Sequence, residues 1–456
     1  MLQRTIGLLM LLTSFVACEK FLEVEPPPTA MVTENVFRDS VTATAAMAGI
    51  YERLMESQSN VFNGSGVLLS GLSTDELLVT STDVLFREFY FHSLPSSHTL
   101  VKNYWQELYQ LIYQCNAQIE GLAEGTANNI SWAKTLTGEA KFLRALAYSE
   151  LQPKFGSVPM ALTTDYRVNK SLPRADSATL YTQVVADLRE AAQLLSQNYH
   201  SASGLRSRPN RSAAFALLSR VYLYQGDWQE TANVADEVLN QGALYELAPA
   251  PGEVFLHGSR ESIWHLPAVV PGYNTGIAST FLQLSGVPTY ATLQPSLVAG
   301  FESGDLRREA WIHTHTYEGT TYHQPYKYRY AERSQGTEHL VLLRLAEVLL
   351  NRAEARLHLG DIPGALGDLN AVRNRAGLAA ISDTDPSSIE AALLQERRME
   401  FMAENGLRFK DLQRTGLFDA TMSALKPNDW KSTAVRFPIP DIEIKNNPAI
   451  TQNPGY

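Results

Sequence analysis

Two helix–turn–helix segments that share one turn sequence constrain the fold of this chain most strongly. They are residues 222–228 (YLYQGDW) and 356–362 (RLHLGDI), and each leads into a second stretch of helical periodicity. In each segment the glycine ends the first predicted helix, and the aspartate caps the second. Small residues on the preceding helices allow the paired helices to approach closely. This pattern predicts antiparallel helix hairpins of the tetratricopeptide type.

Most of the remaining chain also has helical periodicity, and we predict further helices over 41–55, 104–122, 136–151 and 176–195. Two long stretches, 57–100 and 243–337, are instead rich in Pro, Gly, Thr and aromatic residues. Loops of this length without order are uncommon in compact domains, so we expect the two stretches to pack together. The predicted fold class is mostly α, a tetratricopeptide-like hairpin scaffold with an irregular, loop-rich subdomain that carries short strands.

The N-terminus has the pattern of an export signal. Arg4 precedes the apolar run 6–12, and the small residue Ala17 stands directly before Cys18. The apolar run is too short to span a bilayer. This pattern is similar to a bacterial lipoprotein cleavage site, so we predict that Cys18 becomes the lipidated first mature residue. An ordinary signal peptide with an incidental cysteine is the alternative.

These signals divide the chain into three parts. We predict a signal peptide over 1–17, a lipidated, Pro-rich extended linker over 18–30 and a single domain over 31–456. Within that domain we assign the helical body to about 31–56, 101–242 and 338–425, and the ligand-facing excursions to 57–100 and 243–337.

Charge and cysteine content exclude some classes of function. The net charge of −10 argues against nucleic-acid binding, which needs clustered Lys and Arg. The only cysteine besides Cys18 is Cys115, which lies in an apolar helical pattern and is predicted to be a buried, inert thiol.

The richest cluster of charged residues lies over 396–414. Glu396, Glu400 and Glu404 are spaced four residues apart with arginines interleaved. Paired carboxylates are typical of glycoside hydrolases, but this spacing suits ion pairs that tie helices together. We predict a structural role, and the sequence offers no convincing catalytic constellation.

A histidine-rich segment is a candidate for metal binding. His313 and His315 would face the same side of a strand, with Glu309 and His323 nearby. Spacing places no fourth ligand, so we predict a solvent-facing strand, no metal site and no cofactor.

Aromatic residues gather in the two excursions, over 86–91 and 264–330. Flat rings with few rotatable bonds stack well on sugar faces and on extended peptides, although they also build cores. We expect two or three of them to be exposed in one patch. The predicted ligand contacts, chosen because Gly, Pro, Thr or charged neighbours place them near turns, are Trp311, Tyr317, Tyr273, Tyr290, Tyr90 and Phe86.

Several motifs occur in a recognisable order along almost the whole chain. They are CEKFL at 18–22, WQELY at 105–109, GEAKFLRA at 138–145, FGSVP at 155–159, LRLAEVLL at 343–350, LNAVRNRAG at 369–377 and the C-terminal QNPGY at 452–456. On these motifs the chain resembles the SusD/RagB family of outer-membrane nutrient-binding lipoproteins.

The resemblance implies a non-catalytic, lipid-anchored protein exposed at the cell surface. Such a protein captures an oligosaccharide and passes it to a SusC-like TonB-dependent outer-membrane transporter, on which it sits like a lid. Ligand contacts would come from the excursions. A peptide ligand, an envelope scaffold without a ligand, and a lipoprotein hydrolase remain alternatives.

Overall fold

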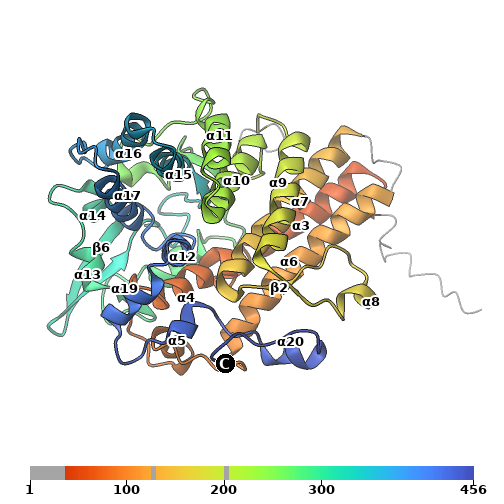
Figure 1. The fold of residues 1–456 in the computed structure, drawn as a ribbon, viewed down its shortest axis with the longest axis horizontal. Helices are drawn as coiled ribbons and strands as arrows, with labels where there is room; N and C mark the ends of the chain where they lie inside the picture. Colours follow the sequence, from red (N-terminus) through yellow and green to blue (C-terminus); the bar gives the residue numbers. More distant parts are fainter. Residues whose placement is uncertain (1–35, 125–129, 200–204) are drawn as a thin grey trace, which may run out of the picture.

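The computed structural model describes residues 36–124, 130–199 and 205–456 (Figure 1). The predicted signal peptide, Cys18 and the linker that ends at residue 30 lie outside these residues. Among the described residues, none of the helices combines the length and apolarity that crossing a bilayer requires.

A row of packed helices forms the body of the molecule. Neighbours along the row are α6 and α7, α7 and α9, α9 and α10, α10 and α11, α11 and α15, and α15 and α16. These helices, with α3 and α17 beside them, are α3 (Ser40–Arg53), α6 (Thr99–Glu124), α7 (Ser131–Phe155), α9 (Ser177–Leu194), α10 (Arg211–Gln225), α11 (Trp228–Leu239), α15 (Leu345–His358), α16 (Ile362–Arg375) and α17 (Pro386–Glu400). The predicted helical scaffold is therefore confirmed.

The two predicted hairpin turns have the expected conformations. Gly226 and Gly360 adopt positive φ angles of 71° and 83°, a region that glycine enters without a steric penalty. Asp227 then caps α11 by accepting from the Glu230 N–H, and Asp361 caps α16 in the same way. These turns fold α10 against α11 and α15 against α16.

The first excursion is more helical than predicted. It contains the π-helical turn η2 (Val61–Ser65), α4 (Gly66–Leu72), β1 (Leu77–Val79) and α5 (Val84–Tyr90). Every residue of α4 is buried, so this helix has no face turned to solvent. Sequence periodicity does not detect a helix that is buried on all sides.

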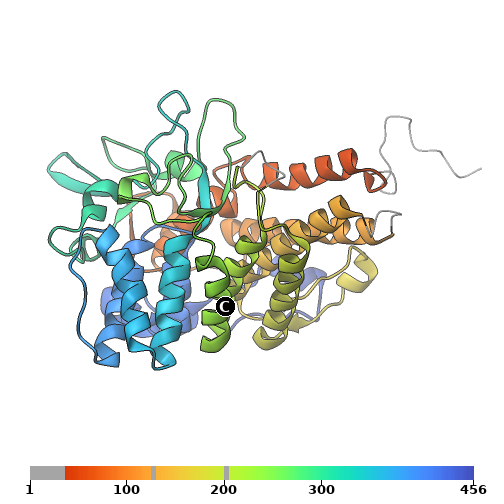
Figure 2. The ribbon, with the colours of Figure 1, turned by 90° about the horizontal axis from the view of Figure 1, so that it is seen from above.

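The second excursion carries half of the strands in the described residues. Its elements, with the strand β8 that follows it, are β4 (Ser262–Leu266), α12 (Gly276–Phe281), β5 (Ala291–Leu293), α13 (Pro295–Val298), α14 (Leu306–Trp311), β6 (Ile312–Tyr317), β7 (Thr320–Pro325) and β8 (Leu340–Arg344). β4 pairs with β8 and β6 with β7, in antiparallel two-stranded sheets. Figure 2 shows the segments that follow α11, from bright green to teal, gathered on one side of the row of helices.

The two excursions are joined through a third small sheet. β1 pairs antiparallel with β5, with Leu77 opposite Leu293. Both leucines are buried in the core. Segments more than 200 residues apart therefore form one loop-rich subdomain, as the sequence predicted.

The remaining α-helices and strands complete the description of the fold. They are β2 (Val158–Pro159), α8 (Tyr166–Asn169), β3 (Arg174–Ala175), α18 (Leu407–Arg414), α19 (Phe418–Leu425) and α20 (Asp441–Asn446). β2 pairs with β3. In Figure 1, α8 and α20 lie at the lower right and bottom, away from β6 and α13 at the left.

Candidate ligand-binding site

The six predicted contact residues lie in different environments, and Trp311 is buried. Its side chain is 1% exposed, and its Nε1 donates to the Pro251 carbonyl at 2.8 Å. The Lys327 Nζ atom lies 4.5 Å from the centre of the indole ring. Trp311 ends α14 and turns inward, so the expectation that it stands at the surface is corrected: the ring belongs to the core.

Tyr273 and Tyr317 are exposed, at 53% and 41%. Tyr273 follows Gly272, which has a positive φ, and Tyr317 ends β6 before the turn at Glu318 and Gly319. They occupy two different turns of the second excursion, one before α12 and one at the tip of the β6–β7 hairpin.

Tyr90 is half-buried and holds neighbouring elements together. The Lys426 Nζ atom lies 3.7 Å from the centre of its ring, and its hydroxyl accepts from Gln294 Nε2 at 3.3 Å. Burial lowers the pKa of Lys426 to about 7. These contacts fix the C-terminal end of α5 against the segment after α19.

The remaining two residues, Phe86 and Tyr290, meet. Phe86 lies on α5 in the first excursion, whereas Tyr290 directly precedes β5 in the second. Their ring centres are 5.0 Å apart with an interplanar angle of 64°, an edge-to-face contact. The Tyr290 carbonyl accepts from the N–H groups of Thr80 and Ser81, which follow β1. The β1–β5 pairing therefore positions both rings.

These two rings line a cavity of about 120 Å³ beside the first turns of α6. Its other apolar lining includes Leu68, Leu100 and Tyr104. Its polar lining is made of amides and hydroxyls, from Gln58, Ser59, Ser65, Asn103 and Thr280. None of the residues lining this cavity carries a formal charge.

The composition of this cavity suits a neutral, polar ligand. Flat rings offer apolar surface, and the amides and hydroxyls around them both donate and accept hydrogen bonds. The volume is below the roughly 300–1,000 Å³ typical of a small-molecule pocket. The cavity therefore suits one ring or one end of a larger ligand, with the rest lying outside.

Sequence reasoning missed the polar half of this site. Asn103 directly precedes the helix predicted over 104–122, in which periodicity assigned only a core stripe. Gln58 and Thr280 lie in the excursions, but short polar residues there carry no signal of their own. They become one site only because β1 and β5 pair.

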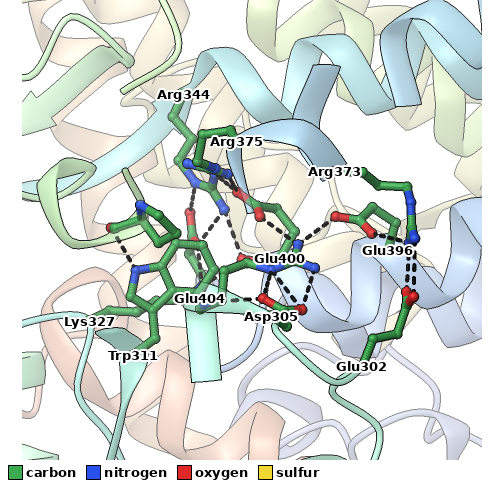
Figure 3. Close-up of polar contacts among 12 residues, drawn as sticks. Glu302, Asp305, Trp311, Lys327, Arg344, Arg373, Arg375, Glu396, Glu400 and Glu404 are labelled. Carbon is green, nitrogen blue, oxygen red and sulfur yellow. Dashed lines mark hydrogen bonds and ion pairs between the residues drawn. The ribbon is translucent and has the colours of Figure 1, made fainter. Parts of the chain in front are cut away.

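The carboxylates that could have indicated catalysis are buried in an ion-pair network (Figure 3). Glu400 pairs with Arg344 at 2.5 Å, with Arg307 at 2.9 Å and with Arg375. Glu404 pairs with Arg344 at 2.7 Å and with Lys327 at 2.8 Å. Although burial opposes it, the surrounding cations lower the pKa of Glu400 well below its usual value.

This network confirms the predicted structural role of the cluster. Glu396 completes it by pairing with Arg307 at 2.5 Å and Arg373 at 3.4 Å. A glycoside hydrolase needs two carboxyl groups that flank an accessible substrate. Here Glu396, Glu400 and Glu404 are all buried and already paired.

The histidine segment forms the predicted strand, β6. The rings of His313 and His315 stack with centres 5.6 Å apart, and His315 Nε2 lies 2.7 Å from the Gly286 carbonyl. Within the described ranges no group of three or more His, Cys, Asp or Glu side chains is arranged to hold a metal ion. Cys115 is free and buried, as predicted, and burial raises the pKa of its thiol.

A row of helix hairpins that carries an uncharged, aromatic-lined cavity defines a helical-repeat binding protein. Two family models match the chain: the SusD family over residues 299–456, and a family described as starch-binding associating with outer membrane over residues 20–223. The chain belongs to the SusD family, and its members are binding proteins.

Two relatives are similar to this chain, one along its whole length and one over a part of it. SusD-like protein P2 of Formosa agariphila is 25% identical, with 99% of each chain covered. The starch-binding protein SusD of Bacteroides thetaiotaomicron is 37% identical over 25% of this chain and 21% of its own.

Solved structures show the same fold. A SusD superfamily protein from Bacteroides vulgatus aligns with a TM-score of 0.81 and 22% identity, over 92% of this chain and 100% of its own. A laminarin binding SusD-like protein aligns with a TM-score of 0.77 and 24% identity, over 92% of this chain and 100% of its own.

Proposed function

We propose that this protein binds a neutral glycan at the Phe86–Tyr290 cavity and presents it for uptake at the outer membrane. The observation that carries the proposal is the cavity itself, in which two aromatic rings are surrounded by amides and hydroxyls without a charged group. Relatives named for starch and laminarin binding support the same class of ligand.

We also propose that the protein is anchored by lipid at Cys18, faces the outside of the cell and delivers its ligand to a SusC-like TonB-dependent transporter. The resemblance to the SusD/RagB family supports this role. Purification of tagged protein from detergent-solubilised outer membranes should co-purify a TonB-dependent channel encoded beside it. A preparation that contains the protein but no such channel would contradict the partnership.

Glycan binding can be tested by titrating the purified protein with maltoheptaose and laminarihexaose in a calorimeter. We expect Tyr290→Ala and Asn103→Ala each to weaken binding at this cavity about tenfold, because they remove a stacking surface and an amide. Asn103 is exposed, so its substitution leaves the fold intact. Tyr166→Ala, which removes a 71% exposed ring on α8, is the control.

Unchanged affinity in both site variants would show that the glycan binds elsewhere. A titration of short peptides with the same variants separates the peptide-binding alternative. If the protein binds peptides, loses this binding in Tyr290→Ala and responds to neither glycan, the ligand class is peptide and not glycan.

A further inference from the structure

A second and larger cavity, of about 390 Å³, lies beside the middle of α6. Its floor is a stripe of three aromatic residues, Trp105, Tyr109 and Tyr113. They are spaced four residues apart, so they lie on one face of the helix, one turn after another. The stripe runs from the buried Trp105 through the half-buried Tyr109 to Tyr113, which is 54% exposed.

Two walls stand over this stripe. One is formed by residues of the chain from β2 to Leu172, and the other by α20 and the residues after it. The Tyr109 hydroxyl donates to the Pro159 carbonyl at 2.6 Å, which holds the first wall to the floor. Asn447 Nδ2 donates to the Leu172 carbonyl at 2.8 Å, which joins the two walls. Side-chain hydrogen bonds therefore hold the cavity open in a defined shape.

The polar lining of this cavity consists mainly of amides. Asn169 donates to the Thr163 carbonyl at 2.7 Å, but its Oδ1 atom is buried and has no hydrogen-bond partner among the described residues. A buried acceptor without a donor carries a free-energy cost, which a ligand hydroxyl would relieve. Lys170 and Glu443 are the two charged residues of the lining, and burial raises the pKa of Glu443.

We propose that this cavity is a second glycan-binding site, which takes a neutral sugar unit against Tyr109 and Tyr113. The aromatic floor suits the apolar face of a sugar ring, and the free Asn169 Oδ1 atom needs a hydroxyl donor. Because this lining carries one positive and one negative side chain, it favours a ligand without net charge. The inference rests on the proposed function in one respect, that the ligand class is a neutral glycan.

The two cavities are independent parts of the surface. Tyr104 lines the first cavity and Trp105 the second. Consecutive helical residues point about 100° apart, so neighbouring faces of α6 serve the two sites. The two linings share no residue, and both sites can be occupied at once. Two contacts on one polymer raise its apparent affinity above that of either site.

The experiment is a calorimetric titration of the full chain with maltoheptaose and with laminarihexaose, one at a time. We expect wild type to bind two ligands per chain. The double variant Tyr113→Ala with Asn446→Ala should weaken the second site about tenfold or more and leave the first unchanged. Both residues are exposed lining residues, so the fold tolerates their loss. Tyr166→Ala, an exposed tyrosine outside the lining, is the matched control.

The first-site variant Asn103→Ala separates the possible outcomes. If this variant keeps one binding event that the second-site variant loses, the proposal is supported. If wild type binds one ligand, and only Asn103→Ala weakens it, the second site is overturned while the proposed function stands. If wild type binds neither glycan, the proposed function fails and the second site falls with it.

Discussion

At the scale of single residues, buried arginines set the energetics of the core. Arg344 at the end of β8 contacts Glu261 at 3.0 Å, Glu400 at 2.5 Å and Glu404 at 2.7 Å. A charge that leaves water is tolerated only when it is paired and hydrogen-bonded. This arginine therefore ties the strands of the loop-rich subdomain to the end of α17.

Substitution of Glu400 should be strongly destabilising. Glu400→Gln leaves Arg307, Arg344 and Arg375 with excess buried charge, which costs about 3–5 kcal/mol. The free energy of unfolding from urea denaturation measures this loss. Glu302→Gln is the matched control, because Glu302 pairs with Arg373 but is 54% exposed. It should cost less than about 1 kcal/mol, and equal losses for the two variants would refute the argument.

At the scale of elements, the hairpins depend on backbone conformations that only some residues adopt. Gly360 stands between α15 and α16 with φ of 83°, whereas Gly367 lies inside α16. A β-carbon at either position would meet no atom within 4 Å. The two glycines therefore differ in backbone conformation and not in the space around them.

This difference predicts opposite effects for the same substitution. Gly360→Ala should lower the free energy of unfolding by about 1 kcal/mol, because alanine is strained at positive φ. Gly367→Ala should raise it by about 0.5–1 kcal/mol, because alanine favours the helix interior. Urea denaturation of both variants gives the comparison, and the same sign for both would contradict the assigned turn.

At the scale of the whole molecule, the first cavity exists because distant segments are brought together. The chain around Gln58, the start of α6, and the segment from α12 to Tyr290 each contribute to its lining. The pairing of β1 with β5 holds these segments in place. The helical row thus supplies one side of the site through α6, and the subdomain beside the row supplies the rest.

The proposed lipid anchor at Cys18 leads to a separate prediction about where the protein is found in the cell. Because several acyl chains hold a protein firmly at a bilayer, Cys18→Ala should move the protein from the membrane fraction to the soluble fraction. Cell fractionation with immunoblotting measures this shift. Cys115→Ala removes the only other cysteine and should stay with the membranes. A Cys18→Ala protein that also stays there would contradict lipidation.

Local sequence patterns predicted some features of the structure correctly and missed others. The Gly-Asp turns predicted the hairpins, because a turn depends on residues a few positions apart. The spacing of the acidic cluster at 396–404 predicted ion pairs but not their partners, because Arg307, Arg344 and Arg375 come from other elements. Phe86 and Tyr290 were each predicted as contacts, but nothing in the sequence indicated that they touch. The turn-forming neighbours of Trp311 led us to predict that it is exposed, but it is buried. Neighbours in the sequence do not determine whether a side chain faces the core or the solvent.

The amino-acid sequence by itself determined the helical scaffold and the family, because helix periodicity, caps and contiguous motifs act within a few turns of chain. It indicated ion pairs for the acidic cluster, but the partners of those pairs come from distant elements. Only the tertiary structure decided which aromatic rings face a cavity and which amides surround them. Those choices depend on contacts between segments far apart in the chain, such as the pairing of β1 with β5 and the hydrogen bond from Asn447 to Leu172. Nothing in the local sequence of such segments indicates that they meet.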